Sequence, residues 1–244
     1  MRGLVLPLLL IGLAEIGARL HGASDVLAPP SAVGVALIEA LRDGSLALAT
    51  RDTLIAAFGG LAAGAMSGLA LGVVLGLSRP LDRLMALPLE LLRPIPSVAV
   101  IPVALVALGF GYRLEIVIVG FACIWPMLIL TRAAVADVEP KLLEVARILR
   151  LTPFATVTKI VVPAALPRIF VAFRLAAGVA LIVAVTVEIA VNPQGLGAAL
   201  MTAGQALRPD LTLACLVWVG IVGFALNQLL LGVEARLFRL GPTR

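Results

Sequence analysis

The sequence predicts an all-α, polytopic integral membrane protein that crosses the bilayer about six times. Hydrophobic residues make up 61% of the 244 positions, charged residues only 14%, and the mean hydropathy is +1.14. Soluble domains average about 45–50% apolar and about 25% charged residues, so this chain has too little polar surface to fold in water. The apolar residues gather in long stretches separated by segments that carry the basic residues. We therefore expect one domain over residues 1–244, built of apolar helices in a lipid bilayer.

The N-terminal part is expected to hold one span and one shorter helix. Residues 1–20 form an apolar stretch interrupted by Glu15. This stretch could also be a secretory signal peptide, but no small-residue cleavage site precedes His21, which favours an uncleaved first span. The segment Leu27–Leu41 has a weak helical pattern and is too short to cross a membrane. We expect it to lie at the outer surface.

Five further apolar stretches are expected to cross the membrane. In order they are Thr53–Leu77, Ile95–Leu108, Leu114–Leu130, Ile169–Ala190 and Leu211–Val233. An amphipathic helix over Ser78–Arg93 is expected at the inner face. A long basic loop, about residues 132–168, separates the fourth span from the fifth, and an excursion over Val191–Pro209 leads to the sixth.

The distribution of lysine and arginine predicts that both termini and the long loop face the cytoplasm. With six spans and the N-terminus inside, thirteen basic residues fall in cytoplasmic segments and five in outer ones, while Arg174 falls within a span. An excess of lysine and arginine is typical of the cytoplasmic loops of membrane proteins. We therefore expect a multi-pass protein of the inner (plasma) membrane.

Composition and motifs argue against several classes of function. The net charge of +5 could suggest nucleic-acid binding, but the basic residues are spread over short loops and aromatic residues make up only 5%. Cys123 and Cys215 lie in apolar runs, and His21 is the only histidine, so we expect neither a disulfide nor a metal site. Neither Lys141 nor Lys159 follows a Gly-x-x-x-x-Gly pattern. Without this phosphate-binding loop, no cofactor is expected on this chain, and any nucleotide must be bound by another.

Glycine recurs at every fourth position along the second predicted span. This glycine strip consists of Gly60, Gly64, Gly68, Gly72 and Gly76. Small residues at this spacing let the backbone of another helix approach closely, and in a bilayer such packing drives helices together. The sequence leaves two interpretations open: a purely structural packing surface, or a smooth surface along which two helices slide during a conformational cycle.

The long basic loop is expected to contain two short helices. Pro140 suits the first position of a helix, where its missing N–H is not needed. The segment Glu144-Val145-Ala146-Arg147-Ile148-Leu149-Arg150 follows it. A second helix is expected after Thr152-Pro153 and leads to Pro163 and Pro167, which would redirect the chain into the fifth span. The loop could be merely a solvated amphipathic segment, or it could be a docking surface for a soluble partner.

In this loop the chain resembles the permease subunits of ATP-binding-cassette importers. Their cytoplasmic signature begins Glu-Ala-Ala-x-x-x-Gly and closes, farther on, with Ile-x-Leu-Pro. Here Glu144-Val145-Ala146 stands at the opening and Ile160-Val161-Val162-Pro163 at the close, at the family's spacing. Three other segments are similar to the branch that imports nitrate, taurine and alkanesulfonates: Leu27–Val33, Leu92–Pro96 and Val187–Ile189.

The resemblance implies that the loop couples this chain to a separate ATPase. The implied coupling residues are Glu144, Val145, Ala146, Arg147, Arg150, Leu151 and Pro163. Two of them depart from the family pattern, since Val145 replaces an alanine and Arg150 replaces the glycine. A glycine would permit a tight turn between the two short helices, whereas we expect Arg150 to take ordinary backbone angles and to add a cation.

Few ionisable residues lie within the predicted spans. Glu188 is the only acidic residue of the fifth span and lies toward its outer end, where a carboxylate costs less than at the bilayer centre. It could be an interfacial glutamate, or it could belong to the transport pathway or its gate, with Asn192 and Gln194 nearby as hydrogen-bonding groups. Arg174, in the inner part of the same span, could pair with an anion or extend toward the inner surface.

By resemblance, the chain is the permease subunit of an ATP-driven importer for a small solute such as sulfonate, taurine or nitrate. The implied assembly contains a second permease copy, ATPase subunits that hold ATP and magnesium, and a periplasmic or lipid-anchored solute-binding protein. No catalytic residue is expected on this chain. One alternative, a self-contained six-span secondary transporter or channel, lacks a detectable inverted repeat. Another, a membrane-embedded enzyme, lacks a constellation of catalytic side chains at membrane depth.

Overall fold

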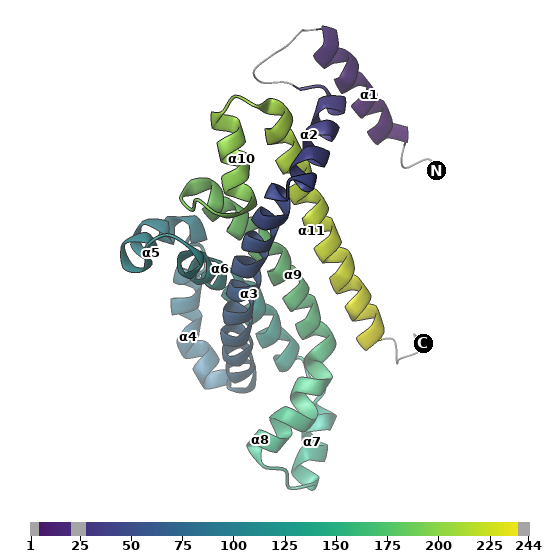
Figure 1. The fold of residues 1–244 in the computed structure, drawn as a ribbon. Helices are drawn as coiled ribbons and strands as arrows, with labels where there is room; N and C mark the ends of the chain where they lie inside the picture. Colours follow the sequence, from purple (N-terminus) through teal and green to yellow (C-terminus); the bar gives the residue numbers. More distant parts are fainter. Residues whose placement is uncertain (1–4, 21–27, 239–244) are drawn as a thin grey trace. The chain divides into compact units, whose positions relative to one another are not determined.

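The structure, a computed structural model, describes residues 5–20 and 28–238, and every regular element in that part of the chain is a helix. The helices are α1 (Val5–Leu20), α2 (Pro30–Arg42), α3 (Ser45–Leu77), α4 (Arg79–Leu92), η2 (Ser97–Val100), α5 (Ile101–Leu108), α6 (Tyr112–Ala136), α7 (Pro140–Ile148), α8 (Pro153–Thr156), η3 (Val157–Val161), α9 (Val162–Ala190), α10 (Gly195–Gln205) and α11 (Pro209–Leu237). Figure 1 shows them coloured along the chain. The predicted all-α class is confirmed.

The described residues form two compact units. The first unit combines the residues up to Leu54 with residues 185–225, and the second combines residues 55–184 with those from Leu226 onward. The first unit therefore contains α1, α2 and α10, together with parts of α3, α9 and α11. The second contains α4 to α8, η2 and η3, together with the remaining parts of those long helices.

Four helical runs in the described residues are long and apolar enough to cross a membrane. They are Ser45–Leu77, Tyr112–Ala136, Pro153–Ala190 and Pro209–Leu237. A fifth arises if α4 and the η2–α5 pair, which meet at an angle of 81°, count as one broken span. The predicted first span corresponds to α1, of which 16 residues are described, while residues 1–4 and 21–27 lie outside the described part. Several such helices in one chain make this a polytopic membrane protein.

The predicted third span, Ile95–Leu108, is not one continuous helix. The chain enters the 3-10 helix η2 and then the eight-residue α5, which is too short to cross a bilayer alone. Prolines account for the break, because Pro94 and Pro96 precede η2 and Pro102 lies in the first turn of α5. Proline has no N–H for the helical ladder, so it is tolerated at helix starts and disrupts helix interiors.

The two short helices predicted over Leu27–Leu41 and Ser78–Arg93 are confirmed as helices by α2 and α4, within three residues of the predicted bounds. Their positions at the membrane surfaces stay predictions. The second span, however, begins eight residues earlier than predicted, at Ser45. Gly44 turns the chain there with a φ of 82°, and the N–H of Ser45 donates to the Asp43 carboxylate over 2.8 Å. This hydrogen bond lowers the pKa of the Asp43 carboxyl below its usual range and satisfies one of the free N–H groups at the helix start.

Within the second unit, the glycine strip of α3 lies against α6. A Cβ atom added at Gly68 would lie 2.7 Å from the carbonyl oxygen of Ile124 and 2.7 Å from the Cβ of Met127. The other four glycines meet α6 in the same way: Gly60 at Val119, Gly64 at Gly120, Gly72 at Thr131 and Gly76 at Val135. The two helices therefore touch along their backbones over the length of the strip, as small residues at this spacing allow.

Within the first unit, hydrogen bonds from side chains connect neighbouring helices. The N–H of Ser31, in the first turn of α2, donates to the Glu15 carboxylate of α1 over 2.9 Å. The indole N–H of Trp218 in α11 donates to the hydroxyl of Thr50 in α3 over 2.8 Å. The unit also contains a small apolar core, which consists of Ala40, Leu46, Leu196 and Cys215. These polar anchors and the core hold α2, α10 and the ends of α3 and α11 together.

Candidate functional site

The long loop of the second unit folds into two short helices, α7 and α8 (Figure 1). Glu139 precedes α7 and Pro140 occupies its first turn, where the missing N–H of proline has no intrahelical partner to lose. Ala146 is the only buried residue of α7 and anchors this helix to the rest of the unit. Glu144, Val145 and Arg147 are exposed around it. The predicted coupling residues thus present a solvated surface on one side and a single buried contact on the other.

Arg150 ends this first helix in a left-handed backbone conformation, with a φ of 50°. The expectation of ordinary backbone angles at this position is therefore wrong. The N–H of Leu151 donates to the carbonyl of Ala146 and that of Arg150 to the carbonyl of Arg147, both over 3.0 Å. This pair of bonds is the usual helix ending around a left-handed residue, a position that favours glycine. Arginine makes the same turn here at a strain of roughly 1–2 kcal/mol.

The chain stays helical from Pro153 through α8, η3 and α9 to Ala190, so Pro163 and Pro167 do not end the helix. The predicted change of direction at these prolines stays a prediction. Thr152 begins this run by accepting the N–H of Ala155 over 3.2 Å. The π-helical turn η3 lies just before Pro163, and the N–H of Val162 bonds to the carbonyl of Val157, five residues back. The wider π turn relieves the clash between a proline ring and the preceding turn, so the helix continues.

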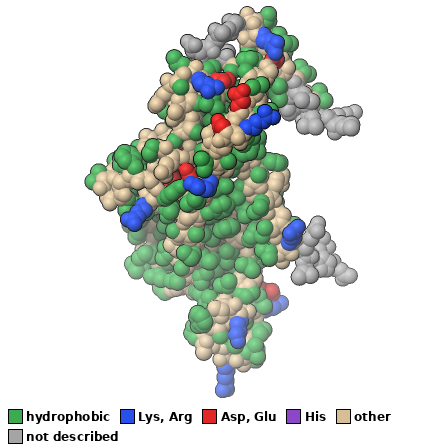
Figure 2. Space-filling model, viewed as in Figure 1, with side chains coloured by type: hydrophobic (Ala, Val, Ile, Leu, Met, Phe, Trp, Pro, Cys, Tyr) green, Lys and Arg blue, Asp and Glu red, His purple; other side chains and the backbone are tan. Residues whose placement is uncertain are grey.

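The end of α7 and the start of α8 expose large apolar side chains, which we call the loop tip. Ile148 is 80% exposed, Leu149 62% and Phe154 79%. The same loop carries four exposed cations: Lys141, Arg147, Arg150 and Lys159. Figure 2 shows lysine and arginine side chains in blue at the lower end of the view, over this loop. An apolar patch bordered by cations is a surface suited to a partner with an apolar groove and an acidic rim.

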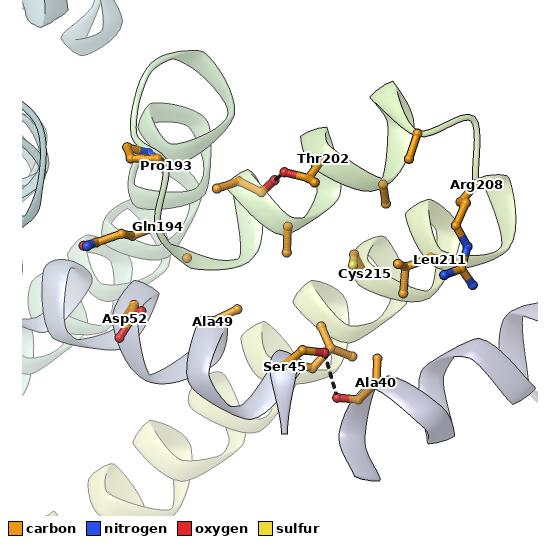
Figure 3. A pocket seen from close by; sticks show the side chains of 16 residues that line it. Ala40, Ser45, Ala49, Asp52, Pro193, Gln194, Thr202, Arg208, Leu211 and Cys215 are labelled. Atoms are coloured by element: carbon orange, nitrogen blue, oxygen red, sulfur yellow. Dashed lines mark hydrogen bonds between the residues drawn. The ribbon is translucent and has the colours of Figure 1, made fainter. Parts of the chain in front are cut away.

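The first unit contains a cavity of about 520 Å³. The end of α2, the start of α3, residues 193–206 and the start of α11 form its walls (Figure 3). Most of the lining side chains are small and apolar, and the polar ones are Ser45, Asp52, Gln194, Thr202 and Arg208. In Figure 3, Asp52 and Gln194 lie at one end and Arg208 at the other. A cavity of this size, apolar with a few polar groups, is typical of sites for small molecules.

Of the predicted pathway residues in this unit, only Gln194 lines the cavity, and Glu188 and Asn192 do not. Glu188 and Asn192 are each only 2% exposed. The carboxylate of Glu188 accepts the N–H of Gly197, in the first turn of α10, over 2.8 Å. Sequence reasoning missed this partner, although the pair of glycines in Gly195-Leu196-Gly197 signals a backbone that approaches another group closely.

Arg174, the remaining pathway candidate, belongs to the second unit and forms an ion pair there. Its guanidinium lies 2.6 Å from the carboxylate of Glu234 in α11, and both side chains are about one-third exposed or less. Nearby, the ring of Phe170 in α9 contacts that of Phe238, which directly follows α11, with centroids 5.6 Å apart. The arginine thus joins α9 to α11 and has an anionic partner within its own chain.

Within residues 5–20 and 28–238, no three histidine, cysteine, aspartate or glutamate side chains come together as metal ligands. The expectation that this chain holds neither a metal ion nor a cofactor stays a prediction.

The fold resembles those of two solved transporters. It matches a chain of the MetNI methionine ABC transporter in an inward-facing conformation with a TM-score of 0.61 and 22% identity, over 75% of this chain and 93% of that one. A chain of an amino acid ABC transporter with histidines matches with a TM-score of 0.61 and 18% identity, over 82% of this chain and 98% of that one. At these identities the likeness concerns the fold.

Three curated relatives are permease proteins of transport systems. The bicarbonate transport system permease protein of Synechocystis sp. is 31% identical over 127 residues, 52% of this chain and 45% of its own. The nitrate import permease protein of Leptolyngbya laminosa is 27% identical, over 55% of this chain and 48% of its own. The taurine transport system permease protein of Escherichia coli is 28% identical over the same shares. The match thus spans about half the length of these relatives.

The family match extends over most of the chain. Residues 53–239 correspond to the family described as the binding-protein-dependent transport system inner membrane component. This range includes the glycine strip, the loop from Glu144 to Pro163 and the helix that carries Glu188. The resemblance inferred from the motifs is confirmed, and the chain belongs to the family of binding-protein-dependent transport system inner membrane components.

Proposed function

We propose that this chain is the permease subunit of an ATP-driven importer of a small solute. The observation that carries the proposal is the loop tip, in which Ile148, Leu149 and Phe154 are exposed beside four cations. Large apolar side chains that gather on a polar loop mark an interaction surface. Membership of a transport-component family, and relatives named as permeases of transport systems, support the same role.

The loop tip is proposed to dock on a separate ATPase subunit that holds ATP and magnesium. Ala146 is buried against this chain and keeps α7 in place, while Glu144, Val145 and Arg147 remain available for a partner. The ion pairs of the loop join Lys141 to Glu139 and Arg168 to Asp137, and neither uses Glu144. The predicted docking groove on the ATPase has an apolar floor for the loop tip and acidic groups for its cations.

Movement of the ATPase is proposed to reach the membrane along the helix that starts at Pro153. Two features support this path. The helix continues without a break to Ala190, and Arg168 in this helix is tied to Asp137 at the other end of the loop by an ion pair of 2.8 Å. An ATPase that binds the loop differently in its open and closed forms would shift the equilibrium between inward-open and outward-open states by that difference in affinity.

The complete assembly is proposed to contain a second copy of this chain, two ATPase subunits and a periplasmic or lipid-anchored solute-binding protein. Both termini would lie in the cytoplasm, and the protein would reside in the inner (plasma) membrane, as the excess of cations in the predicted inner loops supports. The proposed cargo is a small anion such as sulfonate, taurine or nitrate. The names of the bicarbonate, nitrate and taurine relatives support this class.

Affinity purification of the tagged protein from its native membrane tests the proposal. We expect a stoichiometric ATPase in the preparation and its loss in Glu144→Lys, because charge reversal disrupts a docked surface. Ala146→Pro should lose it too, since proline breaks α7. Glu90→Lys, the same reversal at an exposed position of α4, is the matched control and should retain the ATPase.

Equal recovery of the ATPase from wild type and Glu144→Lys would count heavily against docking through α7. A preparation without any ATPase that still moves solute into liposomes in the absence of ATP would overturn the importer and support a self-contained secondary transporter.

A further inference from the structure

At the first turn of α10, the chain meets the end of α9, nine residues back, and α3, 143 residues back. The N–H of Gly197 donates to Oε2 of Glu188 over 2.8 Å. The N–H of the neighbouring residue, Leu196, donates to the hydroxyl of Thr53 over 2.8 Å. Thr53 and Leu196 are fully buried, and Glu188 is 2% exposed. Two N–H groups that a helix start leaves without internal partners thus find acceptors on α9 and α3.

The backbone of α10 approaches Glu188 too closely for any side chain. Gly195 has a φ of 91°, and a Cβ added there would overlap the Glu188 carboxylate. A Cβ at Gly197 would lie 2.7 Å from the Cβ of Glu188 and 2.8 Å from the N of Ile189. The two glycines are therefore needed because of the position of this glutamate. This close contact with Glu188 can form only with glycine at both positions.

The other side of α10 forms a wall of the 520 Å³ cavity. Residues of α10 that line this cavity include Ala198, Ala199 and Thr202, whereas neither Glu188 nor Thr53 lines it. In Figure 3 the α10 ribbon borders the cavity opposite the start of α3, which carries Ser45 and Ala49. The hydrogen bonds that Glu188 and Thr53 accept therefore hold α10 in place without either residue lining the cavity.

We propose that Glu188 and Thr53 are positioning residues, which fix the first turn of α10 and thereby the wall of this cavity. Glu188 acts as a hydrogen-bond acceptor and touches no cargo. Its role in transport rests on the importer function proposed above, with the cavity as part of the solute pathway.

The contact with α10 depends on Glu188 as a hydrogen-bond acceptor. Only Oε2 accepts a hydrogen bond from the described residues, and Oε1 has no such partner. The hydroxyl of Thr53 lies 3.1 Å from the carbonyl of Ala49 and is also within hydrogen-bonding reach of the Glu188 carboxylate. Glutamine has the shape of glutamate and an amide oxygen that can accept the N–H of Gly197, so the contact needs no negative charge. Leucine has a similar volume and no acceptor.

The rate at which Cys215 reacts with a thiol reagent measures the integrity of the cavity wall, and this assay requires neither cargo nor ATPase. Cys215 lines the cavity and is 1% exposed. In a Cys123→Ser background it is the only cysteine of the chain, and its rate of reaction with a small methanethiosulfonate reagent measures access to the cavity. We expect Glu188→Leu and Thr53→Val to raise this rate about five- to tenfold, the effect of losing one buried hydrogen bond. Glu188→Gln and Thr53→Ser should stay within about twofold of wild type, because both keep the acceptor.

Two results would overturn the proposal: a Glu188→Gln protein that reacts as fast as Glu188→Leu, or a Glu188→Leu protein that reacts at the wild-type rate. The first would assign the role to the charge, as a gate or pathway group requires. If Glu188→Leu does not elute as a single folded species, Thr53→Val and Glu188→Gln still decide the matter. Transport by the reconstituted complex should fall in Glu188→Leu and recover in Glu188→Gln. A wild-type complex that fails to transport at all would refute the proposed importer function and leave the labelling result in place.

Discussion

Replacing Gly68 with alanine adds one methyl group at the contact between α3 and α6. That methyl would lie 2.7 Å from the carbonyl oxygen of Ile124 and from the Cβ of Met127, and 3.1 Å from the N of Leu128. Carbon atoms in favourable contact are about 3.5–4.0 Å apart. The crowded atoms belong to the backbone or to a Cβ and cannot rotate away, so the two helices must separate. Overpacking of this kind typically costs about 1–3 kcal/mol, and leucine at the same position should cost more.

A second glycine separates this effect from the helix propensity of alanine. A Cβ at Gly232 in α11 would meet nothing within 4 Å. Gly232→Ala should therefore change stability only by the gain in helix propensity, between zero and about 1 kcal/mol. The two substitutions should shift the melting temperature of the detergent-purified protein in opposite directions. A Gly68→Ala protein that melts at or above the temperature of Gly232→Ala would refute backbone contact along the glycine strip. A loss of transport out of proportion to the loss of stability would favour the sliding interpretation of the strip.

Two further experiments test contacts that the fold creates. Arg150→Gly should stabilise the end of α7 by about 1 kcal/mol, because glycine adopts the left-handed conformation without strain, and slower hydrogen exchange of the α7 amides would report it; unchanged exchange would contradict the strained turn. Arg174→Glu and Glu234→Arg should each destabilise the protein by placing two like charges together, and the double exchange should recover much of the loss. A coupling energy of about 0.5–1.5 kcal/mol is expected for such a pair within membrane helices, and additive effects in the double-mutant cycle would show that the pair contributes nothing.

The fold class and the short helices could be predicted because they depend on residues that are neighbours in sequence. Apolar length sets the spans, and the bounds of α2 and α4 follow from proline at their first turns. The family followed from motif spacing in the loop. The third span was predicted from apolar length alone, which gave too little weight to Pro94, Pro96 and Pro102. Prolines at this spacing by themselves favour a break in the helix.

Other features of the loop do not follow from the preference of the residue itself. Arg150 is an ordinary helix former, and only the pair of hydrogen bonds around Leu149 puts it in a left-handed conformation. Pro163 would normally disturb a helix, and the π turn at Val157–Val161 just before it lets the helix continue. In each case local backbone hydrogen bonds outweigh the preference of a single residue.

By itself, the sequence determined that this protein is a multi-spanning helical membrane protein of a transport family, because hydrophobic length, glycine period and motif spacing are properties of continuous stretches of chain. Tertiary structure alone decided what the functional candidates touch. Thr53 meets the N–H of Leu196 across 143 positions of sequence, and Arg174 meets Glu234 across 60. Contacts between residues so far apart in sequence depend on which helices pack together in the folded protein. The role of a buried glutamate or arginine therefore depends on a neighbour that no local pattern specifies.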